Sequence, residues 1–124
     1  MKRTAAIAAL LLFACVLACA RAYAAETAFS PVPQGTVNIA ATTTTARVQF
    51  QTSAVNKHVR IFNAGTVAAF VACGDANVTA STTTSMPIGG GAAAIIFCPQ
   101  QYIAAITSTT ATVYVTPGNG GGAQ

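Results

Sequence analysis

The residues of this chain that could carry out acid–base or nucleophilic chemistry are few: one histidine, two acidic residues and four cysteines among 124 residues. Acid–base catalysis needs titratable groups held close together, and His58 and Asp75 are one candidate pair. Glu26, the second carboxylate, lies in a segment without periodicity that is poorly suited to hold it in place. The chain has no Gly-x-Ser-x-Gly motif, and residues 89–91 lack the Lys-Ser/Thr of a phosphate-binding loop. We therefore predict no enzymatic activity and no cofactor, with His58 exposed at a strand end.

The cysteines favour a structural role. Cys15 and Cys19 lie in an apolar N-terminal run, which leaves Cys73 and Cys98 as an even pair in the rest of the chain. We predict a Cys73–Cys98 disulfide, since a bridge over a loop of this length stabilises a fold by roughly 3 kcal/mol. Two buried free thiols are the alternative. A structural zinc ion needs four Cys or His ligands and only His58 is available to join the pair, so we predict no metal site.

The N-terminus has the pattern of a cleavable secretory signal over residues 1–24. Lys2 and Arg3 form a short basic region, an apolar run follows, and Ala22 and Ala24 provide the small residues of a signal peptidase site. This pattern predicts export to the periplasm or the exterior, where disulfides form. It also predicts that no membrane segment remains after cleavage.

The N-terminal run also has two less favoured interpretations. A transmembrane anchor is disfavoured because the apolar run at residues 5–20 is short for a span of roughly 20 residues and an Ala-x-Ala site follows it. A lipoprotein signal ending at Cys19 is disfavoured because Leu17 is bulky for its position.

Cleavage would remove most of the positive charge. The whole chain has six basic and two acidic residues, a net charge of +4, and three of the basic residues lie in the predicted signal. Nucleic-acid binding requires several phosphates to be neutralised, so we predict none. The charged residues that remain are Arg47, Lys57, Arg60, Glu26 and Asp75.

The rest of the predicted fold is organised around the stretch from His58 to Cys73. Two apolar runs flank Asn63-Ala64-Gly65, which is the pattern of a β-hairpin. Val59 and Ile61 point to one side of the first run. The second run, Thr66–Cys73, is apolar on both sides, which predicts a central strand or one that is covered by a partner.

Alternation with period two predicts further strands along the chain. We expect seven or eight short strands in an antiparallel β-sandwich or barrel, without a helix after the signal. The predicted domain spans residues 36–117, after an extended arm at 25–35 and before a flexible Gly-rich tail at 118–124, with Pro117 ending the last strand. Besides the central stretch, strands are expected at 36–40, 46–51, 77–80, 92–98, 102–107 and 111–116, with a flexible connection at 81–91.

Two segments resemble small proteins encoded in the structural regions of tailed phages and prophages. VRIFNAGTVAAFVACGDANVTA (Val59–Ala80) is similar to their arginine–aromatic–Asn-x-Gly pattern followed by Gly-Asp and Val-Thr-Ala. YIAAITSTTATVYVTPGNGG (Tyr102–Gly121) is similar to their C-terminal ending. The resemblance implies a β-rich virion decoration or accessory protein that binds a capsid or tail lattice through surface contacts. The export signal and the cysteines at 73 and 98 depart from the pattern and fit a copy adapted to the periplasm or exterior.

We therefore expect a non-enzymatic, exported module that associates through exposed Thr and Gln faces, with a capsid or tail lattice, a cell-envelope protein or itself as partner. The first alternative is a true virion decoration protein assembled on particles. The second is a secreted adhesin or carbohydrate-binding module, although the chain has no Trp and few Tyr residues on which sugars could stack.

Overall fold

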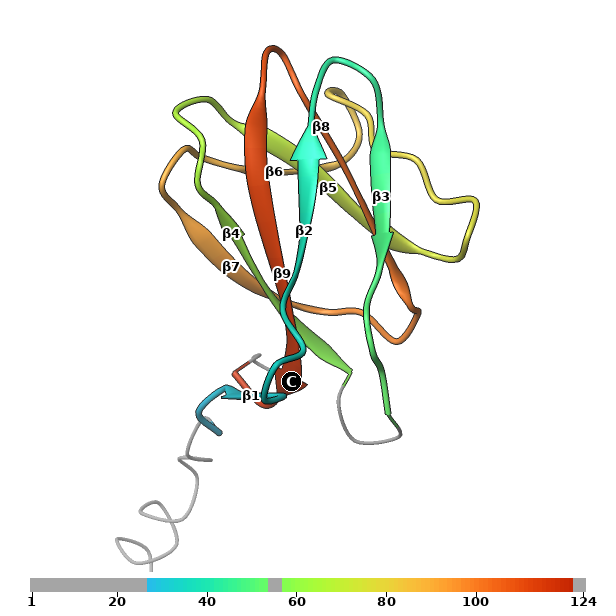
Figure 1. Ribbon diagram of the computed structural model, residues 1–124, viewed down its shortest axis with the longest axis vertical. Helices are drawn as coiled ribbons and strands as arrows, with labels where there is room; N and C mark the ends of the chain where they lie inside the picture. The colour runs from blue at the N-terminus through green and yellow to red at the C-terminus, as the bar shows by residue number, and fades with distance from the viewer. Residues whose placement is uncertain (1–26, 54–56, 122–124) are drawn as a thin grey trace, which may run out of the picture.

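The computed structural model describes residues 27–53 and 57–121, which form nine β-strands and no helix. The strands make two antiparallel sheets that pack face to face (Figure 1). The prediction of a small antiparallel β-sandwich is confirmed, and the two sheets do not close into a barrel. The predicted signal at residues 1–24, with Ala22 and Ala24, lies outside the described residues.

Five strands form one sheet, in the order β1-β9-β4-β7, with β2 also paired to β9. β1 and β2 therefore share one side of the long strand β9. Their bounds are β1 Ser30–Pro31, β2 Val37–Ala41, β4 His58–Asn63, β7 Ala93–Phe97 and β9 Ala111–Asn119.

The other four strands form the second sheet, in the order β3-β8-β5-β6. The sequence prediction for β8 has the same bounds as the structure, those for β3 and β5 differ by a few residues, and β6 was not predicted. Their bounds are β3 Ala46–Gln49, β5 Ala69–Gly74, β6 Met86–Ile88 and β8 Tyr102–Thr107.

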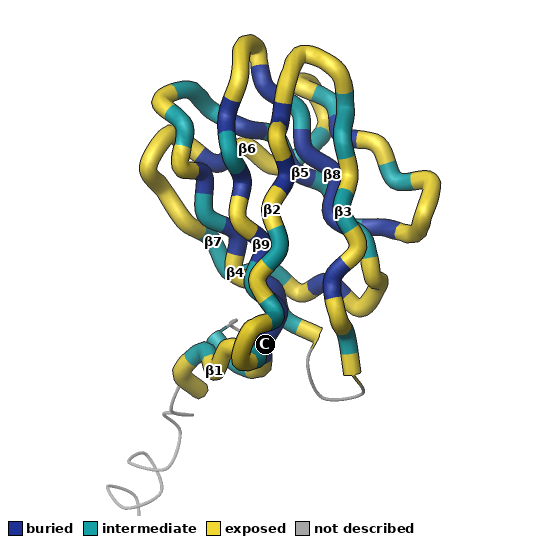
Figure 2. Tube along the Cα trace, viewed as in Figure 1, coloured by how far each residue is buried: buried dark blue, intermediate teal, exposed yellow. Residues whose placement is uncertain are grey.

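The core lies between the sheets and is built largely from alternate residues of the longer strands (Figure 2). Val59 and Ile61 of β4 are fully buried, as their alternation predicted. They meet Val71 of β5 and Ile103 of β8 within the same cluster. Many core residues are Ala, Val or Ile, so the sheets are held together by a core of small and medium-sized side chains.

The predicted hairpin around Asn63-Ala64-Gly65 is wrong. β4 pairs with β7 and β9 in the five-stranded sheet, whereas β5 pairs with β6 and β8 in the other sheet. The segment between β4 and β5 therefore crosses from one sheet to the other. At Gly65 a Cβ atom would lie 2.6 Å from the Cβ of Ala111, so this close passage requires glycine.

Buried Asn63 holds the crossing in place. Its Nδ2 donates to the carbonyl oxygens of Val67 at 2.8 Å and Ile88 at 2.9 Å, and its Oδ1 accepts from the Gly65 N–H at 2.9 Å. Because all three bonds are made by a side chain that is 0% exposed, the polar group is satisfied inside the core. Asn63 therefore marks an inter-sheet crossing, where the same sequence pattern predicts a hairpin turn.

The strand end predicted at Pro117 is also wrong, because β9 continues to Asn119. In this register the N–H groups of odd-numbered β9 residues face β1 and β2. Pro117 lies where β9 changes its partner from β2 to β1, and there its carbonyl accepts from Val32 N at 2.8 Å. The missing N–H of the proline therefore costs no ladder bond.

The predicted arm and tail lie against each other. Ser30 and Pro31 of β1 pair with Asn119 and Gly118, and Gly121 N donates to Thr27 O at 2.6 Å. Residues 118–121 are thus hydrogen-bonded, contrary to the predicted flexible tail. Figure 1 shows the two segments together at the lower end of the sandwich.

The segment after β5 differs from the prediction as well. Residues 77–80 form no strand, and Met86–Ile88, expected in a flexible connection, form β6. Pro87 is accommodated because β6 is an edge strand with β5 as its neighbour. Residues 75–85 form a loop closed by local hydrogen bonds, including Ser85 N to Ser81 O at 3.1 Å.

Candidate functional site

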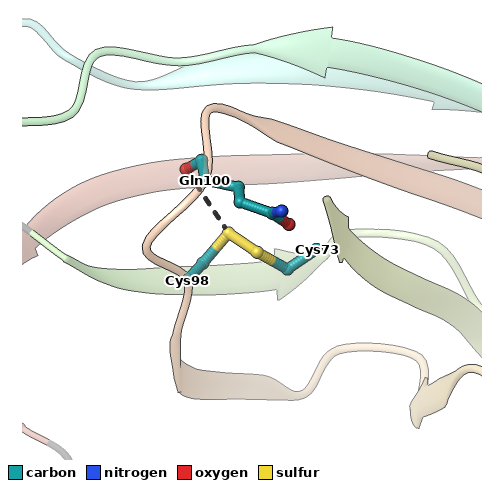
Figure 3. Close-up of a disulfide and its surroundings, with 3 residues drawn as sticks. All are labelled: Cys73, Cys98 and Gln100. Carbon is teal, nitrogen blue, oxygen red and sulfur yellow. Dashed lines mark hydrogen bonds between the residues drawn. A yellow bond between two sulfur atoms is a disulfide. The ribbon is translucent and has the colours of Figure 1, made fainter. Parts of the chain in front are cut away.

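The predicted Cys73–Cys98 disulfide is present (Figure 3). Cys73 lies on β5 and Cys98 directly follows β7, with a Cα–Cα distance of 5.8 Å and a sequence separation of 25. The bridge therefore ties the two sheets together. Cys98 is fully buried, and its Sγ lies 3.7 Å from the carbonyl oxygen of Gln100. Its position indicates a structural role.

The candidate catalytic residues are placed in different environments. His58 begins β4 in the five-stranded sheet, where its ring meets the edge of Phe97 with centroids 5.6 Å apart. It is half-buried, not exposed as predicted, and its Nδ1 has no hydrogen-bond partner within the described residues. Asp75 follows β5 in the other sheet, and its Oδ1 accepts from Asn77 N at 2.8 Å to close a turn. Glu26 lies outside the described residues.

The outer side of the five-stranded sheet carries a group of aromatic and apolar side chains that the sequence analysis did not single out. Phe97 is 61% exposed and Tyr114 is 39% exposed, which is unusual for residues of this size. We call this surface the aromatic face. Its members come from three adjacent strands and are Arg60 and Phe62 on β4, Ile95 and Phe97 on β7, and Tyr114 on β9.

Strand register brings these side chains into contact. Phe62 stands opposite Tyr114, and the two rings stack with centroids 6.4 Å apart and planes 22° apart. Arg60 stands opposite Ile95, and its guanidinium carbon lies 6.0 Å from the centre of the Phe62 ring. Such a cation–π contact holds the exposed guanidinium beside the rings. The aromatic face therefore combines flat apolar surface with one positive charge.

The signal for this surface was present in the sequence. Val113 and Val115 face the core, so alternation directs Tyr114 outward. In the same way, buried Val59 and Ile61 direct Arg60 and Phe62 outward. The sequence does not show that β7 and β9 both flank β4. For this reason, these outward residues could not be assigned to one surface from the sequence.

The outer side of the four-stranded sheet is different, because residues 75–85 fold back across part of it. Arg47 of β3 donates through Nη1 to the carbonyl oxygen of Val78 at 3.5 Å, and Ala80 N donates to Thr45 Oγ1 at 2.9 Å. A Cβ atom on Gly74 would lie 2.7 Å from the Cβ of Val78. Ala104, at the centre of this side, is 0% exposed.

β5 is apolar on both sides, and the fold buries both sides at least in part. Its inner residues Ala69 and Val71 are buried in the core, while Phe70 and Ala72 on the other side are half-buried. The chain itself thus supplies part of the cover for the outer side.

A cleft of about 640 Å³ with polar and apolar lining residues lies near the end of β3. Four glutamines are among its lining residues, and Gln49 Nε2 donates to Gln101 Oε1 at 3.1 Å. Gln34 enters the cleft from the segment before β2 in a left-handed conformation, with φ of 58°. Amide groups of this kind can hydrogen-bond to hydroxyl or peptide groups. The remaining lining residues are Val32, Gly35, Val37, Phe50, Gln51, Thr52 and Ser53.

Over residues 27–53 and 57–121, no group of three or more His, Cys, Asp or Glu side chains is arranged to hold a metal ion. The same residues include no helix of the length and hydrophobicity needed to cross a membrane. The geometry of the described part therefore draws attention to two surfaces, the aromatic face and the glutamine-lined cleft.

Comparisons with protein-family models, with curated proteins and with solved structures find no match to this chain.

Proposed function

We propose that this chain is an exported, non-enzymatic β-sandwich module that acts through protein–protein contacts and resembles phage virion decoration or accessory proteins. The aromatic face is the proposed contact surface, and exposed Phe97 is the observation that carries the proposal. Phe, Tyr and Arg are enriched at protein interfaces and supply much of their binding energy. Arg60, Phe62 and Tyr114 place these residue types side by side.

Export is supported by two independent features. The N-terminal pattern of residues 1–24 is that of a secretory signal. The Cys73–Cys98 disulfide fits an oxidising compartment. Together they favour a cell-envelope or extracellular protein as partner, with a capsid or tail lattice as the alternative that the sequence resemblance suggests.

The test is a photoreactive amino acid placed at single positions in the full chain, in cells that produce it. A probe at Tyr114 is expected to crosslink to a defined envelope, capsid or tail protein. A probe at exposed Thr83, in the loop beyond the four-stranded sheet, is the control and is expected to give no such product. Equal crosslinking from both positions, or none from Tyr114, would contradict the aromatic face as the contact surface.

Mass spectrometry separates the exported form from a virion protein. Export predicts a periplasmic or secreted chain that begins at Ala25, after cleavage at the Ala22-Tyr23-Ala24 site. A chain that retains Met1 and is found on phage particles would instead support the virion role and contradict export.

The glutamine-lined cleft favours a second candidate function, carbohydrate binding by an exported module. Its four amide side chains suit the hydroxyl groups of a sugar. A glycan array is the test, with Gln49→Ala as the variant that removes the Gln49–Gln101 hydrogen bond. Binding that this variant abolishes would support the cleft, and an array without binding would remove this candidate.

A further inference from the structure

Strand β7 is an unprotected edge of the five-stranded sheet. Among the described strands it pairs with β4 alone, and Figure 1 shows it at one edge of that sheet, beside β4. Its sequence, AAIIF, has no charge and no proline. Natural proteins usually protect exposed edge strands with charges, prolines or covering loops, because unpaired backbone groups invite another strand.

The other edge strands in the described part of the chain have such protection. β1 contains Pro31 and β6 contains Pro87. β3 contains Arg47, whose side chain reaches the loop at Val78. β2 lies beside β3 of the other sheet, to which it is connected by a short turn. Among the described strands, β7 therefore stands out as an apolar edge without a charge or a proline, and Gly121 lies against the side chain of Ile95 and leaves the backbone edge of the strand unpaired.

The hydrogen bonds to β4 show which backbone groups of β7 are unpaired. Cys98 N donates to Lys57 O at 2.7 Å, and Ala92 O accepts from Asn63 N at 3.0 Å. Even-numbered residues of this segment therefore direct their N–H and C=O groups toward β4. In an antiparallel ladder the direction alternates, so the odd-numbered residues 93, 95 and 97 direct theirs away from the sheet.

We propose that β7 pairs with β7 of a second copy of this chain, antiparallel and centred on Ile95. A two-fold axis at Ile95 places it opposite Ile95 of the second copy and places Ala93 opposite Phe97. These are the three residues whose backbone groups face the edge, so each pair exchanges two N–H···O bonds. The arrangement is isologous, as expected for a two-fold dimer.

The side chains fit the same register. Ala93, Ile95 and Phe97 all point to the outer side of the sheet, since Ala94 and Ile96 pack against the core. Small Ala93 leaves room for the large ring of Phe97, which is 61% exposed in the single chain. No charged residue lies on the strand, so pairing brings no like charges together.

A second copy is favoured over an unrelated strand because both the backbone groups and the side chains are self-complementary about Ile95. Pairing joins the two five-stranded sheets into one sheet and puts both aromatic faces on the same side. The proposal goes beyond the proposed function and does not depend on what the aromatic face binds.

The first test measures mass in solution over a range of concentrations, using the full chain produced in a host that exports it and forms disulfides. A dimer is expected. Ala93→Pro is expected to weaken association by roughly tenfold or more while keeping the circular dichroism spectrum, because the lost N–H is not used within the fold. Tyr114→Thr is the matched control, since it alters the aromatic face away from the edge, and it is expected to remain dimeric.

The second test checks the register by crosslinking. Residues in a hydrogen-bonded antiparallel pair have Cα atoms about 5.5 Å apart, within the range of a disulfide. Ile95→Cys is therefore expected to form a covalent dimer on mild oxidation. Ala93→Cys, equally near the edge, faces Phe97 and is expected to stay uncrosslinked, whereas a variant with both Ala93→Cys and Phe97→Cys is expected to crosslink.

Three results would overturn the proposal. One is a monomer at every concentration tested. Another is a dimer that Ala93→Pro leaves intact but Tyr114→Thr dissociates, which would place the interface on the aromatic face. The third is equal crosslinking by the Ile95→Cys and Ala93→Cys variants, which would show contact without the predicted register.

Discussion

The outer side of the four-stranded sheet and the outer side of the five-stranded sheet have similar strand patterns and different surroundings. On the first, residues 75–85 fold back and bond to Arg47 of β3 and to Thr45, and Ala104 is fully buried. On the second, Phe97 and Tyr114 remain exposed. An apolar outward side chain on a strand therefore does not by itself indicate a partner, because the chain can supply its own cover.

The difference shows where a binding surface is to be sought. In the sequence, the run Thr66–Cys73 is the strongest candidate for a surface that a partner covers, because it is apolar on both sides. In the fold its inner side lies in the core and its outer side is partly buried. The aromatic residues on β4, β7 and β9 are spread along the sequence and come together only in the sheet. The uncovered surface is thus the one that the sequence shows least clearly.

Removing the disulfide is expected to have the largest effect on stability, because the bond between Cys73 and Cys98 joins the two sheets. The double variant Cys73→Ala/Cys98→Ala is expected to lose roughly 3 kcal/mol of unfolding free energy. Chemical denaturation measures the loss, and the unmodified chain under reducing conditions is the control that should match it. A loss below about 1 kcal/mol would show that the sheets stay joined without the bridge.

The crossing between the two sheets gives the next largest effect. Asn63→Ala would leave the Gly65 N–H and the carbonyl oxygens of Val67 and Ile88 without this partner inside the core, at a cost of about 2 kcal/mol. Asn38→Ala, at an exposed asparagine on β2, is the control and should change stability by less than about 0.5 kcal/mol. Equal effects in denaturation experiments would contradict the role given to Asn63.

Local alternation made much of the fold predictable. The bounds of β8, the inward side chains of Val59 and Ile61, and the Cys73–Cys98 pair all follow from patterns within short stretches. Each depends on a period of two or on a count of residues, and neither requires knowledge of which strands are neighbours.

The features that escaped prediction depend on contacts between distant segments. Asn63-Ala64-Gly65 has the composition of a hairpin turn, and the bonds from Asn63 to Val67 and Ile88 make it a crossing. Pro117 ends a strand by local rules, but β9 changes partners at that position and continues. The aromatic face was missed for the same reason, since Phe62 and Tyr114 are neighbours only through the pairing of β4 with β9.

A smaller effect is expected where the loop covers the four-stranded sheet. Gly74→Ala would place a Cβ atom 2.7 Å from the Cβ of Val78 and push the loop outward. We expect a loss of about 1 kcal/mol and faster proteolysis within residues 75–85. Gly89→Ala is the control, because a Cβ atom there would have Ala92 Cβ at 4.0 Å as its neighbour. Unchanged proteolysis in the Gly74→Ala variant would show that the loop does not act as a cover.

The smallest effect on stability is expected from a substitution on the aromatic face. There we expect a small change in stability and a large change in partner binding. Tyr114→Thr keeps a strand-forming residue at a position that is 39% exposed, so it should cost less than about 1 kcal/mol. It should nevertheless weaken binding to the crosslinked partner by on the order of tenfold or more, because exposed tyrosines often dominate an interface.

Ala104→Thr, at an outward position of the other sheet, should show the opposite pattern. Ala104 is 0% exposed, so extra atoms there should cost about 1–2 kcal/mol, while partner binding should be unchanged. Denaturation and binding measured on both variants therefore separate cover from contact. If Tyr114→Thr lowered stability and spared binding, the aromatic face would be serving the fold, and the distinction between the two sides would fail.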